Sequence, residues 1–253
     1  MAEVRFELRG NVAVITLDAP ARRNALVPSM VAEFVDACAA ADGNPDVGAV
    51  VICGAGESFC SGAHRDVLDG IAQDPAGTAS YQGLSEMYRA FTRLSEVLVP
   101  SIAAVRGHAV GAGVNMMLAA DLRIIAHEAR VISGFGAIGL HPGGGHFSLL
   151  GRVGTRDAAA AVGLFGQQVT GRRAAEVGLA WESLPADDVE PRAMEIAARV
   201  ARDPELARAS ARSFRAELGP PALAWANALD IEKGVQMWSL RRRHQASQGG
   251  DPS

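Results

Sequence analysis

The sequence predicts an α/β fold, because short apolar runs and helical segments alternate through its first two thirds. Each apolar run is too short for a helix and leads into a glycine-rich loop, which is typical of a buried parallel strand. In such folds, ligand sites lie at the loops beyond the strand ends. The strand candidates are Ala49–Cys53, Ser101–Val105 and Arg123–Ala126, and the helical segments are Val67–Ile71, Ala112–Ala120 and Arg156–Leu164.

The first elements are a hairpin and an amphipathic helix. Apolar and polar residues alternate over 4–8 and again over 12–17, with the turn Arg9–Asn11 between them, so we expect two antiparallel strands. Ser29 is placed to cap the helix, and Gly43 is placed to end it. One face of this helix is apolar and consists of Met30, Phe34, Ala37, Cys38 and Ala41.

The final third of the chain predicts a helical region. Residues 191–202 and 204–218 have helical patterns, and a third helix follows Pro220-Pro221. An apolar stripe on this third helix needs a cover, which is either the chain's own core or a neighbouring subunit. Residues 245–253 are rich in Ser, Gly and Gln and predict a disordered tail. The stripe consists of Ala228, Ile231, Val235 and Trp238.

Composition restricts the classes of function. The chain of 253 residues is 49% hydrophobic and 21% charged, and its net charge of −4 gives no positive field for nucleic acid. No apolar span is long enough to predict a membrane crossing, and residues 1–20 lack the pattern of a secretory signal. The three cysteines and six histidines have no metal-ligand spacing. We therefore expect a cytoplasmic protein with reduced thiols and no metal.

Two loops carry the residues best suited to chemistry. The first spans 58–66, where the small residues Ser61-Gly62-Ala63 let a ligand approach the backbone and the following helix start leaves N–H groups unpaired. The second spans 106–115 and repeats this design with Gly111-Ala112-Gly113. One such loop is typical of tight packing between a strand and a helix. Two of them, each after a parallel-type strand, predict a shared pocket.

Motifs spread along the whole chain resemble the crotonase superfamily, which includes enoyl-CoA hydratases and isomerases. The stretch FCSGAHRDVL is similar to the family's FCAGADLKE-type segment. GHAVGAGVNMMLAADLRI is similar to its G-x-A-x-G-G-G-x-E-L-A-x-x-C-D-L-R segment, and ARRNAL, GLHPGGG and VTGRRAAEVGLAWESLP resemble three further motifs. The resemblance runs from the first hairpin to the last helices. It is specific for membership of the superfamily and unspecific for the reaction.

The resemblance implies a spiral of ββα units over residues 1–190, which holds an acyl-CoA site. A helical oligomerisation region over residues 191–244 follows and would pack homotrimers or dimers of trimers. The backbone N–H groups of Ala63 and Ala112 match the family's oxyanion-hole positions, where a thioester oxygen is polarised. Coenzyme A is implied as part of the substrate, and no prosthetic group is implied.

Arginines are candidates to supply the positive charge that the phosphates of coenzyme A require. By the resemblance, Arg22, Arg23 and Ala25 lie where family members hold the coenzyme, and Gly111 contributes bare backbone. Arg65 and the run 241–243 are candidates to reach the phosphates. For the terminal run, a solvated helix face is an equal alternative.

Two positions depart from the hydratases of the family. Those enzymes use a pair of glutamates to move protons to and from the acyl chain, and the matching positions here are Asn115 and Phe135. Neither side chain exchanges a proton near neutral pH. Because losing one general acid or base costs about 10²- to 10⁴-fold in rate, the sequence predicts an acyl-CoA protein without efficient hydratase activity.

Histidines are candidates for a replacement acid or base. His64 follows the first oxyanion position, and His141 precedes Pro142-Gly143-Gly144-Gly145. A histidine titrates near neutral pH, although a single loop histidine is more often a structural hydrogen-bonding group. We expect a smaller role for His146, because it follows the motif.

Two functions stay open at this stage. The first is an enzyme that stabilises a thioester enolate and acts as an isomerase, lyase or hydrolase. The second is a non-catalytic acyl-CoA binder, in which Phe135 fills space that a carboxylate occupies in the hydratases. A purely structural scaffold would leave the two glycine-rich loops without a purpose.

Overall fold

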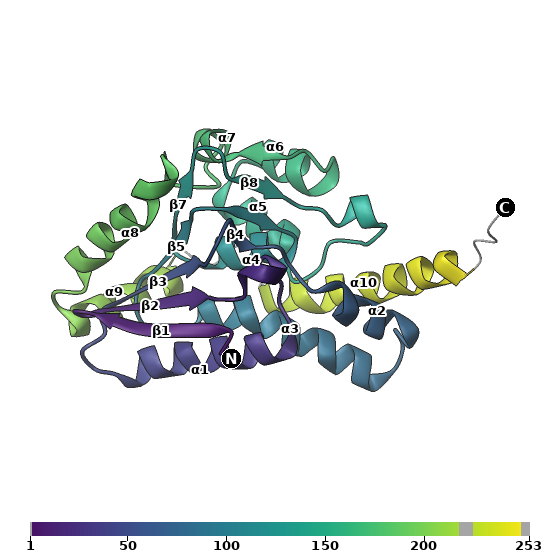
Figure 1. The fold of residues 1–253 in the computed structure, drawn as a ribbon, viewed down its shortest axis with the longest axis horizontal. Helices are drawn as coiled ribbons and strands as arrows, with labels where there is room; N and C mark the ends of the chain where they lie inside the picture. Colours follow the sequence, from purple (N-terminus) through teal and green to yellow (C-terminus); the bar gives the residue numbers. More distant parts are fainter. Residues whose placement is uncertain (1, 218–224, 249–253) are drawn as a thin grey trace.

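The computed structural model describes residues 2–217 and 225–248, and its largest sheet has six strands (Figure 1). The strand order is β1-β2-β3-β5-β7-β10, and all neighbours are parallel except the antiparallel pair β1/β2. The predicted hairpin and the three predicted strands are confirmed. The bounds are β1 Val4–Arg9, β2 Val12–Leu17, β3 Ala49–Gly54, β5 Ser101–Val105, β7 Leu122–Ala126 and β10 Glu182–Leu184.

A second sheet, of four strands, brings the two glycine-rich loops together. Its strands β4 (Ser58–Cys60), β6 (His108–Val110) and β8 (Arg130–Ile132) are parallel neighbours, and β9 (Val169–Thr170) pairs with β8 in the antiparallel sense. Parallel neighbours end at the same edge of a sheet, so the segments after β4, β6 and β8 lie side by side. The first loop was expected over 58–66, but its first three residues form β4 and extend this sheet.

Helices pack on both sheets. Helix α1 (Pro28–Gly43) contacts β1, β2 and α3 (Thr78–Ser95), whereas α8 (Ala186–Val200) lies along β3, β5 and β7. Residues 20–22 and 136–138 form single 3₁₀ turns, and 160–164 a π-helical turn. The other helices are α2 Arg65–Gln73, α4 Ala112–Ala119, α5 His146–Val153, α6 Arg156–Ala159, α7 Gly171–Glu176, α9 Pro204–Glu217 and α10 Trp225–Gln248.

Three helices differ from the sequence prediction. Helix α1 begins at Pro28, a residue suited to the first turn, and the predicted cap Ser29 instead donates its hydroxyl to Glu3 Oε2 at 2.7 Å. Helix α8 begins at Ala186, before Pro191, because buried Val189, Ala193 and Ala197 hold it on the sheet. Helix α3 was not predicted, although its buried residues recur at helical spacing.

The last helix packs on the chain's own core. Helix α10 contacts α2 and α3 and continues to Gln248, so residues 245–248 are helical where a disordered tail was expected. Trp238 of the predicted apolar stripe is 56% exposed on the single chain, so the chain's own core does not cover it, and cover by a neighbouring subunit stays a prediction. The remaining stripe side chains and residues 249–253 lie outside the described part. The residues that α10 buries are Lys233, Gln236, Met237 and Leu240.

Helix α4 is pressed against β4. A Cβ atom on Gly113 would lie 2.1 Å from the carbonyl oxygen of Cys60, so only glycine fits at this position. Residues 113–119 of this helix are all buried. The close contact sets the N-terminus of α4 beside the segment that follows β4.

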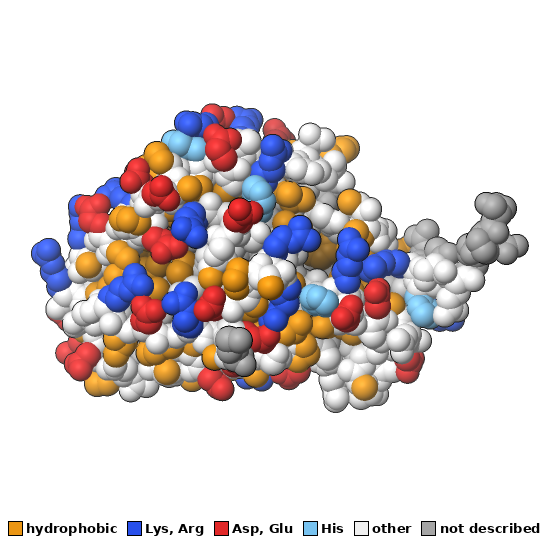
Figure 2. Space-filling view, viewed as in Figure 1, with side chains coloured by type: hydrophobic (Ala, Val, Ile, Leu, Met, Phe, Trp, Pro, Cys, Tyr) orange, Lys and Arg blue, Asp and Glu red, His pale blue; other side chains and the backbone are white. Residues whose placement is uncertain are grey.

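The surface carries charges of both signs. Figure 2 shows acidic and basic side chains largely interspersed over one face of the molecule. Within residues 2–217 and 225–248, no helix combines the length and the apolar content that a bilayer crossing requires. The same residues contain no group of three or more His, Cys, Asp or Glu side chains arranged to hold a metal ion.

Candidate active site

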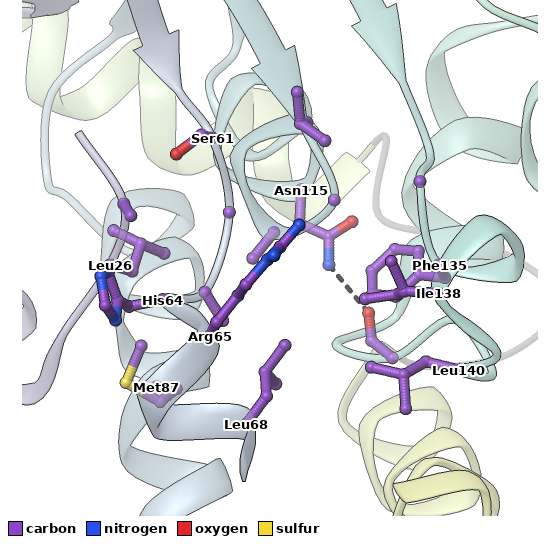
Figure 3. A pocket seen from close by; sticks show the side chains of 18 of the residues that line it. Leu26, Ser61, His64, Arg65, Leu68, Met87, Asn115, Phe135, Ile138 and Leu140 are labelled. Carbon is purple, nitrogen blue, oxygen red and sulfur yellow. Dashed lines mark hydrogen bonds between the residues drawn. The ribbon is translucent and has the colours of Figure 1, made fainter. Parts of the chain in front are cut away.

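A cavity of about 590 Å³ opens where β4, β6 and β8 end (Figure 3). The two glycine-rich loops form one side of it, and α2, α3 and the segment after β8 form the others. One residue of α10, Gln236, also lines it, so the last helix closes the cavity within the same chain. Much of the wall is apolar, with Leu68, Leu84, Met87, Phe91, Ile138 and Leu140.

The first loop directs the Ala63 N–H group into the cavity. Leu26 and Ala63 form a parallel bridge, in which Leu26 N–H donates to the Gly62 carbonyl at 2.7 Å and His64 N–H donates to the Leu26 carbonyl at 2.9 Å. In such a bridge the backbone groups of Ala63 itself face the opposite side. Within the described residues, the Ala63 N–H donates to no other backbone group. Gly62 makes the turn possible, with a φ of 89°.

The second loop places the Ala112 N–H group next to the first. Gly111 adopts φ 54° and ψ −117°, a conformation open only to glycine, and Ala112 then begins α4. N–H groups of a first helical turn have no partner within the helix. A Cβ atom on Gly62 would lie 3.4 Å from the Ala112 nitrogen, so the two loops are in contact. Ala63 and Ala112 both line one cavity, and backbone N–H groups at such positions are suited to hold an oxygen that carries negative charge.

One turn further along α4, the Asn115 amide is held at both edges. Its Nδ2 donates to the Gly143 carbonyl at 2.8 Å, and its Oδ1 lies 2.7 Å from His146 Nδ1. The side chain lines the cavity, and the residue is 1% exposed. Phe135 also lines the cavity and meets the His146 ring edge-on, with 5.1 Å between ring centroids.

His146 was expected to have a smaller role than His64 and His141, but it is the histidine that contacts Asn115. It is 0% exposed, and burial lowers the pKa of its imidazole to about 3, so the ring is neutral. Gly144 and Gly145, both with φ above +70°, bring it back beneath Asn115. The signal for this turn in the sequence is the glycine run directly before His146, because glycine readily adopts the positive φ angles that other residues resist.

The two histidines expected at the site have different places. His64 lines the cavity but caps α2, because its Nδ1 accepts the Asp66 N–H at 3.3 Å. His141 is not among the residues that line the cavity, and its Nδ1 donates to the Pro142 carbonyl at 2.6 Å. His64 thus lies at the cavity as the N-cap residue of α2, whereas His141 lies outside the cavity lining.

The predicted cofactor-binding residues mostly meet at the cavity. Arg22, Arg23, Ala25, Arg65 and Gly111 all line it. Arg22 is committed within the protein, since it pairs with Glu3 at 2.5 Å and its Nε donates to the Ala25 carbonyl at 3.0 Å. In Figure 3 the Arg65 side chain extends across the cavity between His64 and Asn115. Among the terminal arginines, Arg243 pairs with Asp69 of α2 at 3.2 Å.

Cysteine chemistry does not serve this cavity in the described residues. All three cysteines are buried. Burial raises the pKa of the Cys38 and Cys60 thiols to about 12, so both stay protonated near neutral pH. A thiol in that state is a poor nucleophile, and the cavity's reactive groups are its backbone N–H groups and its polar side chains.

Comparison with known proteins gives one consistent family. Residues 7–245 match the family model described as Enoyl-CoA hydratase/isomerase. The Mycobacterium tuberculosis protein named "Probable enoyl-CoA hydratase EchA14" is 43% identical over 215 residues, which are 84% of this chain and 81% of that protein. The 1,2-epoxyphenylacetyl-CoA isomerase of Escherichia coli is 31% identical over 196 residues, which are 76% of this chain and 74% of that protein. A crystal structure of an enoyl-CoA hydratase from Mycobacterium avium subsp. paratuberculosis superimposes with a TM-score of 0.81 at 26% identity and covers 99% of both chains.

The neutral state of His146 predicts a loss of stability in acid. The imidazole of the unfolded chain binds a proton below its ordinary pKa of 6.5, whereas the folded chain binds that proton only near pH 3. Stability is therefore full above pH 6.5 and falls as the pH drops towards 3. Between pH 7.5 and 5.0 the loss due to His146 is about 2 kcal/mol in the free energy of unfolding.

Urea unfolding at these two pH values measures this loss. The matched control is His146→Asn, which keeps a donor near the Nδ1 position and cannot titrate. We expect the variant to lose about 2 kcal/mol less than the parent chain over the same interval. Equal losses in the two proteins would contradict a neutral buried His146.

Proposed function

We propose that this chain, which belongs to the enoyl-CoA hydratase/isomerase family, binds an acyl-CoA thioester. In this proposal the thioester oxygen lies between the N–H groups of Ala63 and Ala112. The observation that carries this proposal is the contact of the two loops, each presenting a backbone donor to one cavity. Preorganised donors of this kind stabilise the negative charge that develops on a thioester oxygen when a proton leaves the α carbon.

The favoured chemistry is that of a thioester enolate rather than efficient hydration. Hydration needs one group to deprotonate water and another to deliver a proton, and Asn115 and Phe135 do neither. The cavity nevertheless keeps both oxyanion donors, which serve any reaction through an enolate. We therefore assign the chain to the isomerase, lyase or hydrolase reactions of the family.

A second candidate is a non-catalytic acyl-CoA binder. It is favoured by the apolar Phe135 ring in the cavity wall and by the engagement of both edges of the Asn115 amide within the protein. A panel of acyl-CoA esters separates the two candidates. Turnover of at least one ester supports the enzyme, whereas binding of esters without turnover of any supports the binder.

The coenzyme would lie along the arginines at the cavity mouth. Arg23 and Arg65 line the cavity and form no ion pair in the described part of the chain, so their guanidinium groups are suited to the phosphates. Coenzyme A then takes part as a portion of the substrate. No prosthetic group enters this proposal.

Removing one oxyanion donor tests the proposed thioester site. Ala112→Pro deletes the N–H group at the first position of α4, where proline is well tolerated. We expect turnover of acyl-CoA, measured by the steady-state rate, to fall about 10²- to 10³-fold. If no ester is turned over, the carbonyl stretch of a ¹³C-labelled thioester, measured by infrared difference spectroscopy, replaces the rate: its shift to lower frequency in the parent complex should be largely lost.

Two controls accompany this variant. Free coenzyme A has no thioester carbonyl, so its affinity for Ala112→Pro should match its affinity for the parent chain. Arg156→Pro places proline at the first position of α6, outside the cavity, and should leave the rate or the carbonyl frequency unchanged. An Ala112→Pro protein that behaves like Arg156→Pro in these measurements would rule out the thioester site.

Restoring two carboxylates tests the assignment of the replaced positions. We expect the double variant Asn115→Glu with Phe135→Glu to hydrate crotonyl-CoA at least about tenfold faster than the parent chain, because it regains a proton donor and a proton acceptor. Loss of absorbance of the conjugated thioester measures the rate. Each single variant is a control and should gain less. A folded double variant with no gain would place the acyl chain elsewhere.

We also propose that the chain assembles into homotrimers or pairs of trimers, as the resemblance to the family implies. The support is that Leu164, Phe165 and Trp181 are large hydrophobic residues exposed on the single chain. Light scattering from the purified protein should give three or six chain masses. A single chain mass at micromolar concentration would contradict this assembly.

A further inference from the structure

The two positions that lack glutamate converge on one buried histidine. His146 forms a hydrogen bond with Asn115 and an edge-on ring contact with Phe135. Neither contact reaches the surface, since His146 is 0% exposed. The three side chains, from α4, the segment after β8 and the start of α5, form a unit that we name the Asn–Phe–His cluster: Asn115, Phe135 and His146.

The direction of the hydrogen bonds follows from the partners. A backbone carbonyl only accepts, so the edge of the Asn115 amide that faces the Gly143 carbonyl is the Nδ2 edge. The other edge is therefore Oδ1, and it accepts the proton of His146 Nδ1 at 2.7 Å. The neutral imidazole thus carries its proton on Nδ1. The amide oxygen is satisfied inside the protein, and what Asn115 has left for a ligand is its second N–H.

We propose that His146 is a positioning residue that fixes the Asn115 amide with its donor edge available to the acyl cavity, and that the cavity thereby selects 3-oxoacyl thioesters. This inference rests on the proposed acyl-CoA function and names the substrate class for that same site.

The place of the acceptor oxygen follows from helix geometry. Asn115 and Ala112 are three residues apart and lie on one face of α4, separated by about 4.5 Å along its axis. In this proposal the thioester oxygen lies at the Ala112 N–H, and an oxygen on the third carbon of the acyl chain accepts the Asn115 N–H. A ketone oxygen only accepts hydrogen bonds, which matches a side chain that only donates.

This substrate class also accounts for a cavity without the glutamate pair. A proton on C2 between two carbonyl groups is far more acidic than in a simple thioester, and it leaves to solvent water. The electrons of the C2–H bond then spread over both oxygens. The N–H groups of Ala63 and Ala112 stabilise one of these oxygens, and the Asn115 N–H stabilises the other.

The glycine backbone packs closely against the cluster. A Cβ atom on Gly144 would lie 2.7 Å from Asn115 Nδ2 and 2.5 Å from the Phe91 ring, so the chain passes directly against the amide. A Cβ atom on Gly143 would collide with the Gln236 side chain. The glycine run is therefore packed so that one carbonyl and one imidazole hold the two edges of Asn115.

Ligand selectivity tests the proposal. The parent chain should bind 3-oxobutyryl-CoA at least about tenfold more tightly than butyryl-CoA, and the bound 3-oxo ester should show the near-ultraviolet band of its enolate at neutral pH. His146→Phe keeps a ring against Phe135 but leaves the Asn115 oxygen without its donor. We expect this variant to lose the selectivity and most of the enolate band, while its affinity for butyryl-CoA stays within about twofold.

Two further variants separate positioning from general packing. His146→Asn retains a donor near the Nδ1 position and should recover both the selectivity and the band. Asn115→Leu should lose both, and adding His146→Phe to it should cost nothing more, because the histidine acts through the amide. Equal selectivity in the parent and the His146→Phe variant, or a parent chain that binds both esters alike, would overturn the inference.

The tautomer of His146 gives a test that needs no variant. Nitrogen-15 chemical shifts of the intact protein should show the proton of His146 on Nδ1. A proton on Nε2 alone would mean that the Asn115 amide is not held as described, and it would overturn the inference. Failure of the proposed function is a different result, in which neither ester binds and the Ala112→Pro variant changes nothing.

Discussion

The arrangement of the cavity depends on the parallel pairing of β4 with β6. Because the two strands run in the same direction, they end at one edge, and each is followed by a glycine with positive φ, Gly62 or Gly111. The pairing alone would place two loops side by side. Helix α4 then presses on β4 through Gly113 and fixes the distance between the loops. Every proposal about the cavity requires this contact.

Backbone donors and side chains carry different information about function. The positions of the Ala63 and Ala112 N–H groups depend on the backbone conformation. Many different sequences can preserve these positions if they preserve the glycines of the two loops. Such donors suit any thioester that gains negative charge on its oxygen. The side chains that line the cavity determine which protons can move, and the amide of Asn115 and the phenyl ring of Phe135 exchange no proton near neutral pH. Membership of the family and the reaction are therefore separate questions for this chain.

The sequence predicted the hairpin, the buried strands and the segments that meet at the cavity, because short apolar runs and glycine loops are local signals. It did not predict α3, although the buried residues of this helix recur at helical spacing. It also failed for Gln236 of α10, which lines the cavity, and for His146, which lies behind the cavity wall and contacts Asn115. Contacts between segments distant in the chain leave no periodic pattern in the sequence, so the pattern did not predict the places of His146 and Gln236.

The identity of residue 115 sets the charge of the cluster behind it. A carboxylate at that position, 2.7 Å from His146 Nδ1, would favour the protonated imidazole and raise its pKa, since opposite charges stabilise each other where water is excluded. With an amide in that place, burial is the cause that remains, and the ring stays neutral. Phe135 is compatible with a neutral ring and gives a charged one no counter-ion. Asn115, Phe135 and His146 are thus consistent with one another as an uncharged set.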